Sequence, residues 1–154
     1  MEDEIMTSAE AFEASALPCA RVVHADPKAA PTAEQKPLPK AVAQKPVEQK
    51  SPAEWAYERL ILYIKNFEEQ LDAGQEVAMG FAGGEAGVIR IEGIGYFDPD
   101  IVTFYGQDDA GAKTQLIQHV TRLSVMLRAV PKEPEAEEPR RIGFRLAETL
   151  DDKT

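Results

Sequence analysis

The sequence predicts an α+β protein, mainly β, in which a disordered tail and one helix precede an antiparallel sheet of five to six short strands. Three observations support this fold class. Residues 25–50 are rich in Ala, Pro, Lys and Gln without an aromatic residue, a helix-start signal stands at Ser51, and short β-prone runs separated by turn residues follow Gly74. A stretch without aromatic side chains cannot bury enough apolar surface to fold alone, so the folded domain is expected to begin at Ser51.

Charge is distributed unevenly along the chain. The net charge is −10; residues 1–50 carry 8 acids and 6 bases, whereas residues 51–154 carry 19 acids and 11 bases. Because phosphate groups are bound mainly by Lys and Arg, this acidity disfavours RNA, and we expect neither DNA nor an anionic membrane as a partner. The acidic first residues, and the lack of an apolar run of about 20 residues, predict a cytoplasmic protein.

Residues 1–50 are predicted to be a disordered tail that acts as a linker or tether. A more apolar run over residues 17–23 suggests a short motif that binds a protein partner; the alternative is a chance apolar stretch within an unstructured tail. The run contains Cys19, the only cysteine, so the chain alone can form neither a disulfide nor a thiolate metal site.

Residues 52–72 are predicted to form an amphipathic helix. Ser51 suits the N-cap, Pro52 suits the first helical position, and Glu54 would complete a capping box. Gly74 stands where such a helix would end. Apolar residues recur with helical spacing at Ala56, Leu60, Ile64, Phe67 and Leu71.

The residues after Gly74 predict a meander of strands. The β-prone runs are residues 76–81, 87–96, 101–105, 114–119 and 123–130, with a polar hairpin loop at 107–112. Leu116, Val120, Leu123 and Leu127 also fit helical spacing, so a helix over this part is the alternative. An acidic, proline-rich loop is expected at 131–141, a further strand at 142–149 because apolar residues alternate there, and a polar end at 150–154.

Two stretches resemble the Sm-like fold, most closely the bacterial Hfq RNA chaperones. The first is Gly87-Val88-Ile89-Arg90-Ile91-Glu92-Gly93-Ile94-Gly95-Tyr96-Phe97-Asp98-Pro99-Asp100-Ile101-Val102, and the second is Gln115-Leu116-Ile117-Gln118-His119-Val120-Thr121-Arg122-Leu123-Ser124. The likeness spans about residues 52–130. It implies that residues 51–130 form one domain, in which a helix precedes a small barrel of strongly bent strands. It favours strands over a helix at 116–127. The whole chain is also similar to an uncharacterised bacterial family with the Gly-Tyr-Phe-Asp-Pro-Asp stretch.

The resemblance implies assembly but weakens RNA binding. Sm-like subunits form rings because the fourth strand of one pairs with the fifth strand of the next, so a homo-oligomer is expected. In the RNA-binding family an aromatic ring three residues after the Phe of Phe-Asp stacks on a base, and here that position is Asp100. Gln118 replaces the Lys of a Lys-His pair, which leaves His119 alone.

The residue types do not indicate an enzyme. Nucleophilic catalysis needs a nucleophile beside a base, and the only histidines are His24, in the tail, and His119. We therefore expect no catalytic residues, no cofactor and no metal. Candidate binding residues are Phe97, Asp98, Asp100, Gln118 and His119. Three hypotheses follow: a non-catalytic oligomeric adaptor, an Hfq-like RNA-binding protein, or a protein that binds a small molecule or nucleotide between subunits.

Overall fold

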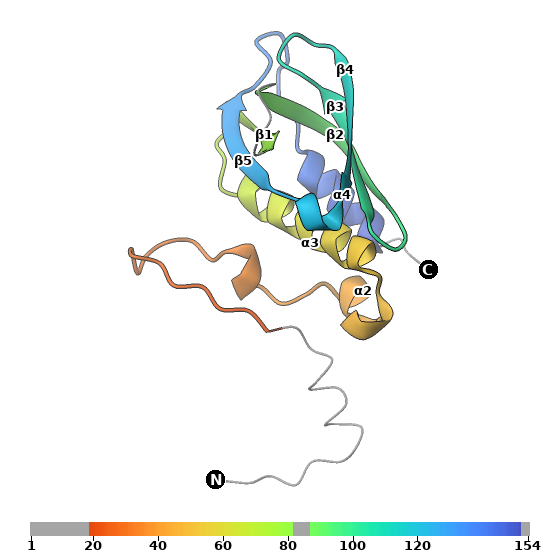
Figure 1. Ribbon diagram of the computed structural model, residues 1–154. Helices are drawn as coiled ribbons and strands as arrows, with labels where there is room; N and C mark the ends of the chain where they lie inside the picture. Colours follow the sequence, from red (N-terminus) through yellow and green to blue (C-terminus); the bar gives the residue numbers. More distant parts are fainter. Residues whose placement is uncertain (1–18, 82–86, 152–154) are drawn as a thin grey trace, which may run out of the picture.

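A computed structural model, which describes residues 19–81 and 87–151, shows an open five-stranded antiparallel sheet packed on a long helix (Figure 1). The strands are β1 (Gln75–Phe81), β2 (Val88–Phe97), β3 (Ile101–Gln107), β4 (Lys113–His119) and β5 (Val125–Pro131). The order across the sheet is β4-β3-β2-β1-β5, and a 3-10 turn, η3 (Val120–Arg122), joins β4 to β5. The predicted α+β fold class is confirmed, and the sheet has five strands. Residues 116–127 belong to β4, η3 and β5, so the alternative of a helix over this part is wrong.

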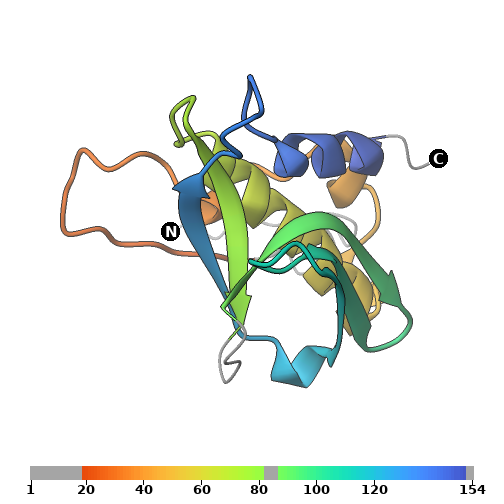
Figure 2. The same cartoon turned by 90° about the horizontal axis from the view of Figure 1, so that it is seen from above.

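The sheet bends strongly within β2. Figure 2 shows it curling into an arc that is not closed. The start of β2 pairs with β1 and the rest pairs with β3, with a bulge between Ile91 and Gly93. Gly106 lies opposite the bulge, where an added Cβ would stand 2.1 Å from the Arg90 carbonyl oxygen, so only glycine fits this close approach.

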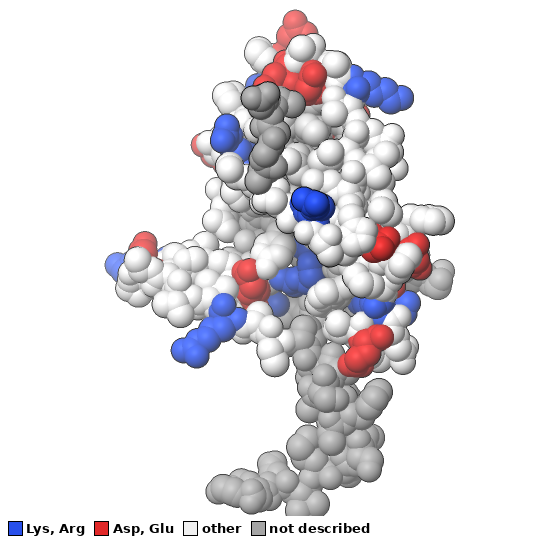
Figure 3. Space-filling model, viewed as in Figure 1, with Lys and Arg blue, Asp and Glu red and all other residues white. Residues whose placement is uncertain are grey.

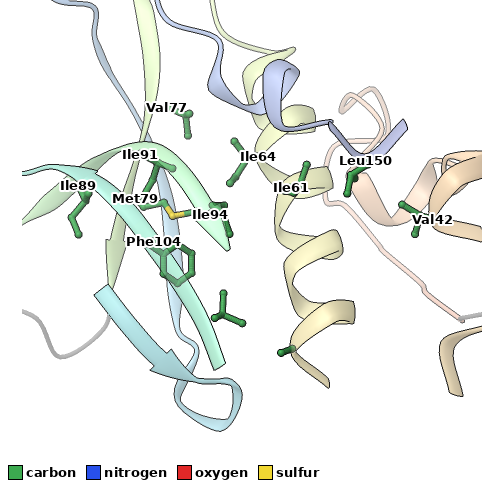
Figure 4. Close-up of a cluster of buried hydrophobic side chains, with 12 residues drawn as sticks. Val42, Ile61, Ile64, Val77, Met79, Ile89, Ile91, Ile94, Phe104 and Leu150 are labelled. Carbon is green, nitrogen blue, oxygen red and sulfur yellow. The ribbon is translucent and has the colours of Figure 1, made fainter. Parts of the chain in front are cut away.

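Helix α3 (Pro52–Glu68) begins where the sequence predicts. The Ser51 hydroxyl accepts a hydrogen bond from the Glu54 N–H at 3.0 Å, which is the expected N-cap bond. Its apolar face packs into the concave side of the sheet, and one core cluster results (Figure 4). Central members of that cluster are Ile61 and Ile64 of α3, Met79 of β1, Ile94 of β2 and Phe104 of β3.

The expected strand at 142–149 is wrong, because these residues lie in helix α4 (Ile142–Asp151). The alternation of Ile142, Phe144 and Leu146 indicated a strand, but Leu150 continues the spacing from Leu146 at one helical turn and is only 2% exposed. Phe144 is 58% exposed, where a strand facing the core would have buried it. Gly143 allows α4 to approach α3, since its added Cβ would lie 2.8 Å from Ile64 Cγ2.

The N-terminal segment also differs from the expectation. Residues 1–18 lie outside the described part, but residues 33–50 are not a disordered tail: they form the turns η1 (Ala33–Gln35) and η2 (Val47–Gln49) and the short helix α2 (Lys40–Ala43). Val42 joins the core at 1% exposure. The sequence argument missed this because the segment folds by covering α3 and α4 instead of forming a core of its own.

A buried ion pair holds this segment to α3. Lys50 Nζ lies 2.6 Å from Glu58 Oε1, and both side chains are 1% exposed. The same ammonium donates to the Val42 carbonyl oxygen at 2.6 Å and lies 5.0 Å from the centre of the Trp55 ring. Because each charge is removed from water, each needs its partner in the folded state.

The loop at 132–141 contains neither helix nor strand and is tied to the sheet by arginines. Arg140 donates to the Ile91 carbonyl oxygen at 2.9 Å, and Arg141 donates to the Gln75 carbonyl oxygen at 2.7 Å. The buried Glu76 carboxylate accepts from the Arg140 N–H and pairs with Arg90, each at 2.7 Å. This acidic stretch therefore stays beside the sheet through its basic end.

We predict that Glu58→Ala destabilises the protein by about 3–5 kcal/mol, since it leaves the Lys50 charge buried without its partner. Urea unfolding, monitored by the fluorescence of Trp55, measures this change in the free energy of unfolding. The control is Glu69→Ala, which removes an exposed ion pair with Lys36 and should cost less than about 1 kcal/mol. Equal effects of the two substitutions would contradict the structural role assigned to the buried pair.

We predict a pH-dependent contribution from Glu68, whose Oε1 accepts the Phe144 N–H of α4 at 3.1 Å. Burial raises the pKa of Glu68, and bonds from the main chain of α4 only partly oppose it. The folded state thus holds the proton more tightly than the unfolded state, so stability is lost as pH rises through the raised pKa. Glu68→Gln should lack this loss. Parallel stability profiles of the two proteins from acidic to neutral pH would disprove the assignment.

Candidate functional site

The turn between β2 and β3 is fixed against the start of α3. The Ser51 hydroxyl donates to Asp98 Oδ1 at 2.6 Å, and the Ala53 N–H donates to the Pro99 carbonyl oxygen at 2.9 Å. Asp98 therefore has a structural partner at the helix N-terminus, where a carboxylate is favoured. This contact places the turn, and with it Phe97 and Asp100, at a defined position beside α3.

His119 links the same turn to the end of β4. Its Nε2 lies 2.9 Å from Asp100 Oδ2, and its Nδ1 lies 2.8 Å from Thr121 Oγ1. The Thr121 N–H points at Nδ1 at 3.2 Å, so in the neutral ring Nδ1 is the acceptor and the proton lies on Nε2, facing the carboxylate. The Asp100 carbonyl oxygen also accepts the Val120 N–H at 2.9 Å. Asp100 and His119 thus hold each other at the surface.

The strand register brings Phe97 to the same face as His119. Phe97 is paired with Ile101 across β2 and β3, and Ile101 is paired with His119 across β3 and β4. Residues directly opposite each other in a sheet project from the same face. Phe97 is 75% exposed, more than the exposed aromatic residues Phe144 (58%) and Tyr105 (43%).

Gln118 does not belong to this group. It is paired with the fully buried Val102, so it projects from the opposite face of the sheet, toward the core side. Its Oε1 is buried and has no hydrogen-bond partner within the described part of the chain. Four of the five candidate residues are therefore brought together, and the fifth is separated from them by the sheet.

Two residues that the sequence analysis missed complete this surface. Tyr105 is 43% exposed and Ile117 is 62% exposed, and the register places both on the face of Phe97 and His119. The Tyr105 ring lies across Gly93 and Gly95, whose added Cβ atoms would each come within 3.7 Å of it. Alternation along residues 101–107 could have revealed Tyr105. We call Phe97, Ile101, Tyr105, Ile117 and His119 the aromatic face.

Within residues 19–81 and 87–151, no group of three or more His, Cys, Asp or Glu side chains could hold a metal ion. In the same described ranges, no helix combines the length and apolar character needed to cross a bilayer.

Comparison with known proteins places the chain in a family. Residues 46–145 match the model of a family of unknown function, DUF6173. The chain belongs to the DUF6173 family. In this DUF6173 protein the matched range includes α3, the whole sheet and the aromatic face, and it ends within α4. No curated protein and no solved structure matches the chain.

Proposed function

We propose that this DUF6173 protein is a non-catalytic adaptor that assembles by pairing β4 of one copy with β5 of the next. The observation that carries the proposal is the strand order, which leaves β4 and β5 at opposite edges of one bent sheet. An exposed edge is a template for pairing with another strand, and cyclic pairing removes both edges. A helix followed by five strands in this order also supports the Sm-like resemblance, which implies the same pairing.

Apolar side chains at the two edges support the pairing. Ile117 of β4 is 62% exposed and Met126 of β5 is 55% exposed. Met126 is paired with Gly80 on β1, and both Ile117 and Met126 project from the face of the sheet that points away from α3. Adding β4 of a second copy to β5 would place these two side chains on one continuous face, where each could cover the other.

The other face of β5 is apolar as well. A groove of about 350 Å³ runs between α3 and β5 and is lined by Leu60, Tyr63, Ile64, Leu123, Val125 and Leu127. The inward side of β4 carries the half-buried Leu116. In the proposed assembly, Leu116 of the added strand projects toward this groove. Repetition then presents several copies of the aromatic face, which suits an adaptor that binds a protein partner.

A second candidate function is binding of single-stranded RNA. Phe97 and Tyr105 expose their rings on one sheet face, an arrangement on which bases can stack. Asp98, Asp100 and the net charge of −10 oppose a phosphate backbone, so this function ranks second. Binding of a small molecule or nucleotide between subunits, in contact with Phe97, Asp100 and His119, stays a prediction.

We predict that the full-length protein is larger than its 16.9 kDa monomer in size-exclusion chromatography with light scattering. Ile117→Asp and Met126→Asp should each give monomers, because a buried carboxylate at either edge would break the pairing. The matched control is Phe144→Asp, an equally exposed apolar residue on α4 that should leave the assembly intact. A monomeric wild-type protein would refute the proposed assembly.

For RNA we predict at most weak binding. Fluorescence anisotropy with labelled oligo-U and oligo-A at about 50 mM salt measures it, since electrostatic binding is strongest at low salt. If RNA binds, Phe97→Ala and Tyr105→Ala should each weaken it, whereas Phe144→Ala should not. An absence of binding at this salt concentration would remove the second candidate.

A further inference from the structure

A groove with a basic and aromatic lining separates the N-terminal segment from α3. It has a volume of about 710 Å³, within the range of about 300–1,000 Å³ that is typical of small-molecule sites. Figure 3 shows a hollow with basic side chains between this segment and the body of the protein. The groove lies on the side of α3 that carries Trp55 and Arg59, and it shares only Tyr63 with the groove beside β5.

The lining is cationic in a protein that is acidic overall. Arg21, Lys36 and Arg59 line the groove with a single carboxylate, Glu34. That carboxylate is engaged, because it accepts a hydrogen bond from the Tyr63 hydroxyl. Consistently, the bond from Tyr63 lowers the pKa of Glu34, and burial raises the pKa of Tyr63, so the phenol keeps its proton. Glu34 therefore stays ionised, and the three bases still outnumber this one acid in the lining, which favours an anion.

Two aromatic side chains and one arginine form a row on one side of α3. Trp55, Arg59 and Tyr63 are spaced by four residues, which places them one above the other on the helix. The Arg59 guanidinium already lies 4.9 Å from the centre of the Tyr63 ring. Such a row of indole, guanidinium and phenol offers stacking surfaces to a planar ring.

A smaller pocket adjoins the groove and shares Lys36 and Arg59 with it. It has a volume of about 80 Å³ and is also lined by Lys65 and by Glu69, the ion-pair partner of Lys36. Asn66 lines it too, and the Asn66 Oδ1 is buried without a hydrogen-bond partner in the described part of the chain. A buried acceptor of this kind lacks a donor that a ligand hydroxyl could supply.

We propose that this groove binds a nucleoside phosphate. The base stacks beside Trp55 and Tyr63, the phosphate lies among Arg21, Lys36 and Arg59, and a sugar hydroxyl donates to Asn66. The proposal goes beyond the assembly proposed above and does not depend on it. The α3 side of the site lies within the family match, whereas Arg21 and Lys36 precede residue 46 and lie outside it.

Trp55 is the only tryptophan, so its fluorescence reports on the groove directly. The full-length protein is titrated with AMP, with adenosine and with inorganic phosphate. We expect a saturable change with AMP and at least tenfold weaker binding, about 1.4 kcal/mol, of adenosine and of phosphate. Arg21→Gln/Lys36→Gln should weaken AMP binding at least about tenfold. The control Lys28→Gln/Arg145→Gln removes the same charge from exposed positions outside the groove and should bind AMP normally.

The outcomes separate the possibilities. No saturable change with AMP, phosphate binding as tight as AMP, or an equal loss in the control pair would each overturn the proposal. If the double variant does not fold, the single Arg21→Gln variant gives the decisive comparison, because Arg21 is exposed and makes no ion pair with another described residue. Met126→Asp should bind AMP like the wild type, which distinguishes failure of this site from failure of the assembly.

Discussion

The unpaired edges of one bent sheet are the constraint on which this account of the protein depends. β4 and β5 end the strand order, and each therefore presents a row of main-chain N–H and C=O groups that no other described strand pairs. The sheet is strongly bent, but it does not close into a barrel. Proteins usually blunt such edges with charges, bulges or a covering element. Here each edge strand has one exposed basic residue, Lys113 or Arg128, and it also exposes a large apolar side chain, Ile117 or Met126.

Helix α3 organises everything around that sheet. At its first turn Ser51 and Ala53 bind the turn between β2 and β3, and this fixes one end of the aromatic face. At its middle Glu58 receives the buried Lys50 and thereby attaches the N-terminal segment. At its last turn Glu68 accepts the N-terminal N–H of α4. The sheet, the segment and the second helix thus each have a polar anchor on α3, in addition to the direct contacts of α4 with α2 and β2.

The sequence predicted the elements whose signals are local. Ser51 and Pro52 located the start of α3, and the glycines and acidic turn residues after Gly74 separated the strands correctly. The helix at 142–151 was missed because three alternating apolar residues fit a strand, and only Leu150 distinguishes the two periods. The order of residues 33–50 was missed because it depends on Lys50 reaching Glu58, a contact that composition cannot show.

The site was predicted in part for the same reason. The pairing of Asp100 with His119 joins residues 19 apart in sequence, and the family resemblance pointed to both positions without showing that they bind each other. Gln118 was grouped with them because the resemblance places it at the Lys of a Lys-His pair, although neighbouring residues in a strand project to opposite faces. Tyr105 and the cationic groove above α3 require the register and the packing of the N-terminal segment, which only the structure supplies.

The most direct measurement of the central claim is amide hydrogen exchange, resolved by residue, in the full-length protein. If β4 and β5 pair between copies, their outward N–H groups should exchange as slowly as those of the interior strand β3, and dilution should accelerate them selectively. If the edges stay open, those groups will exchange quickly at every protein concentration while β2 and β3 remain protected, and that result would contradict the account.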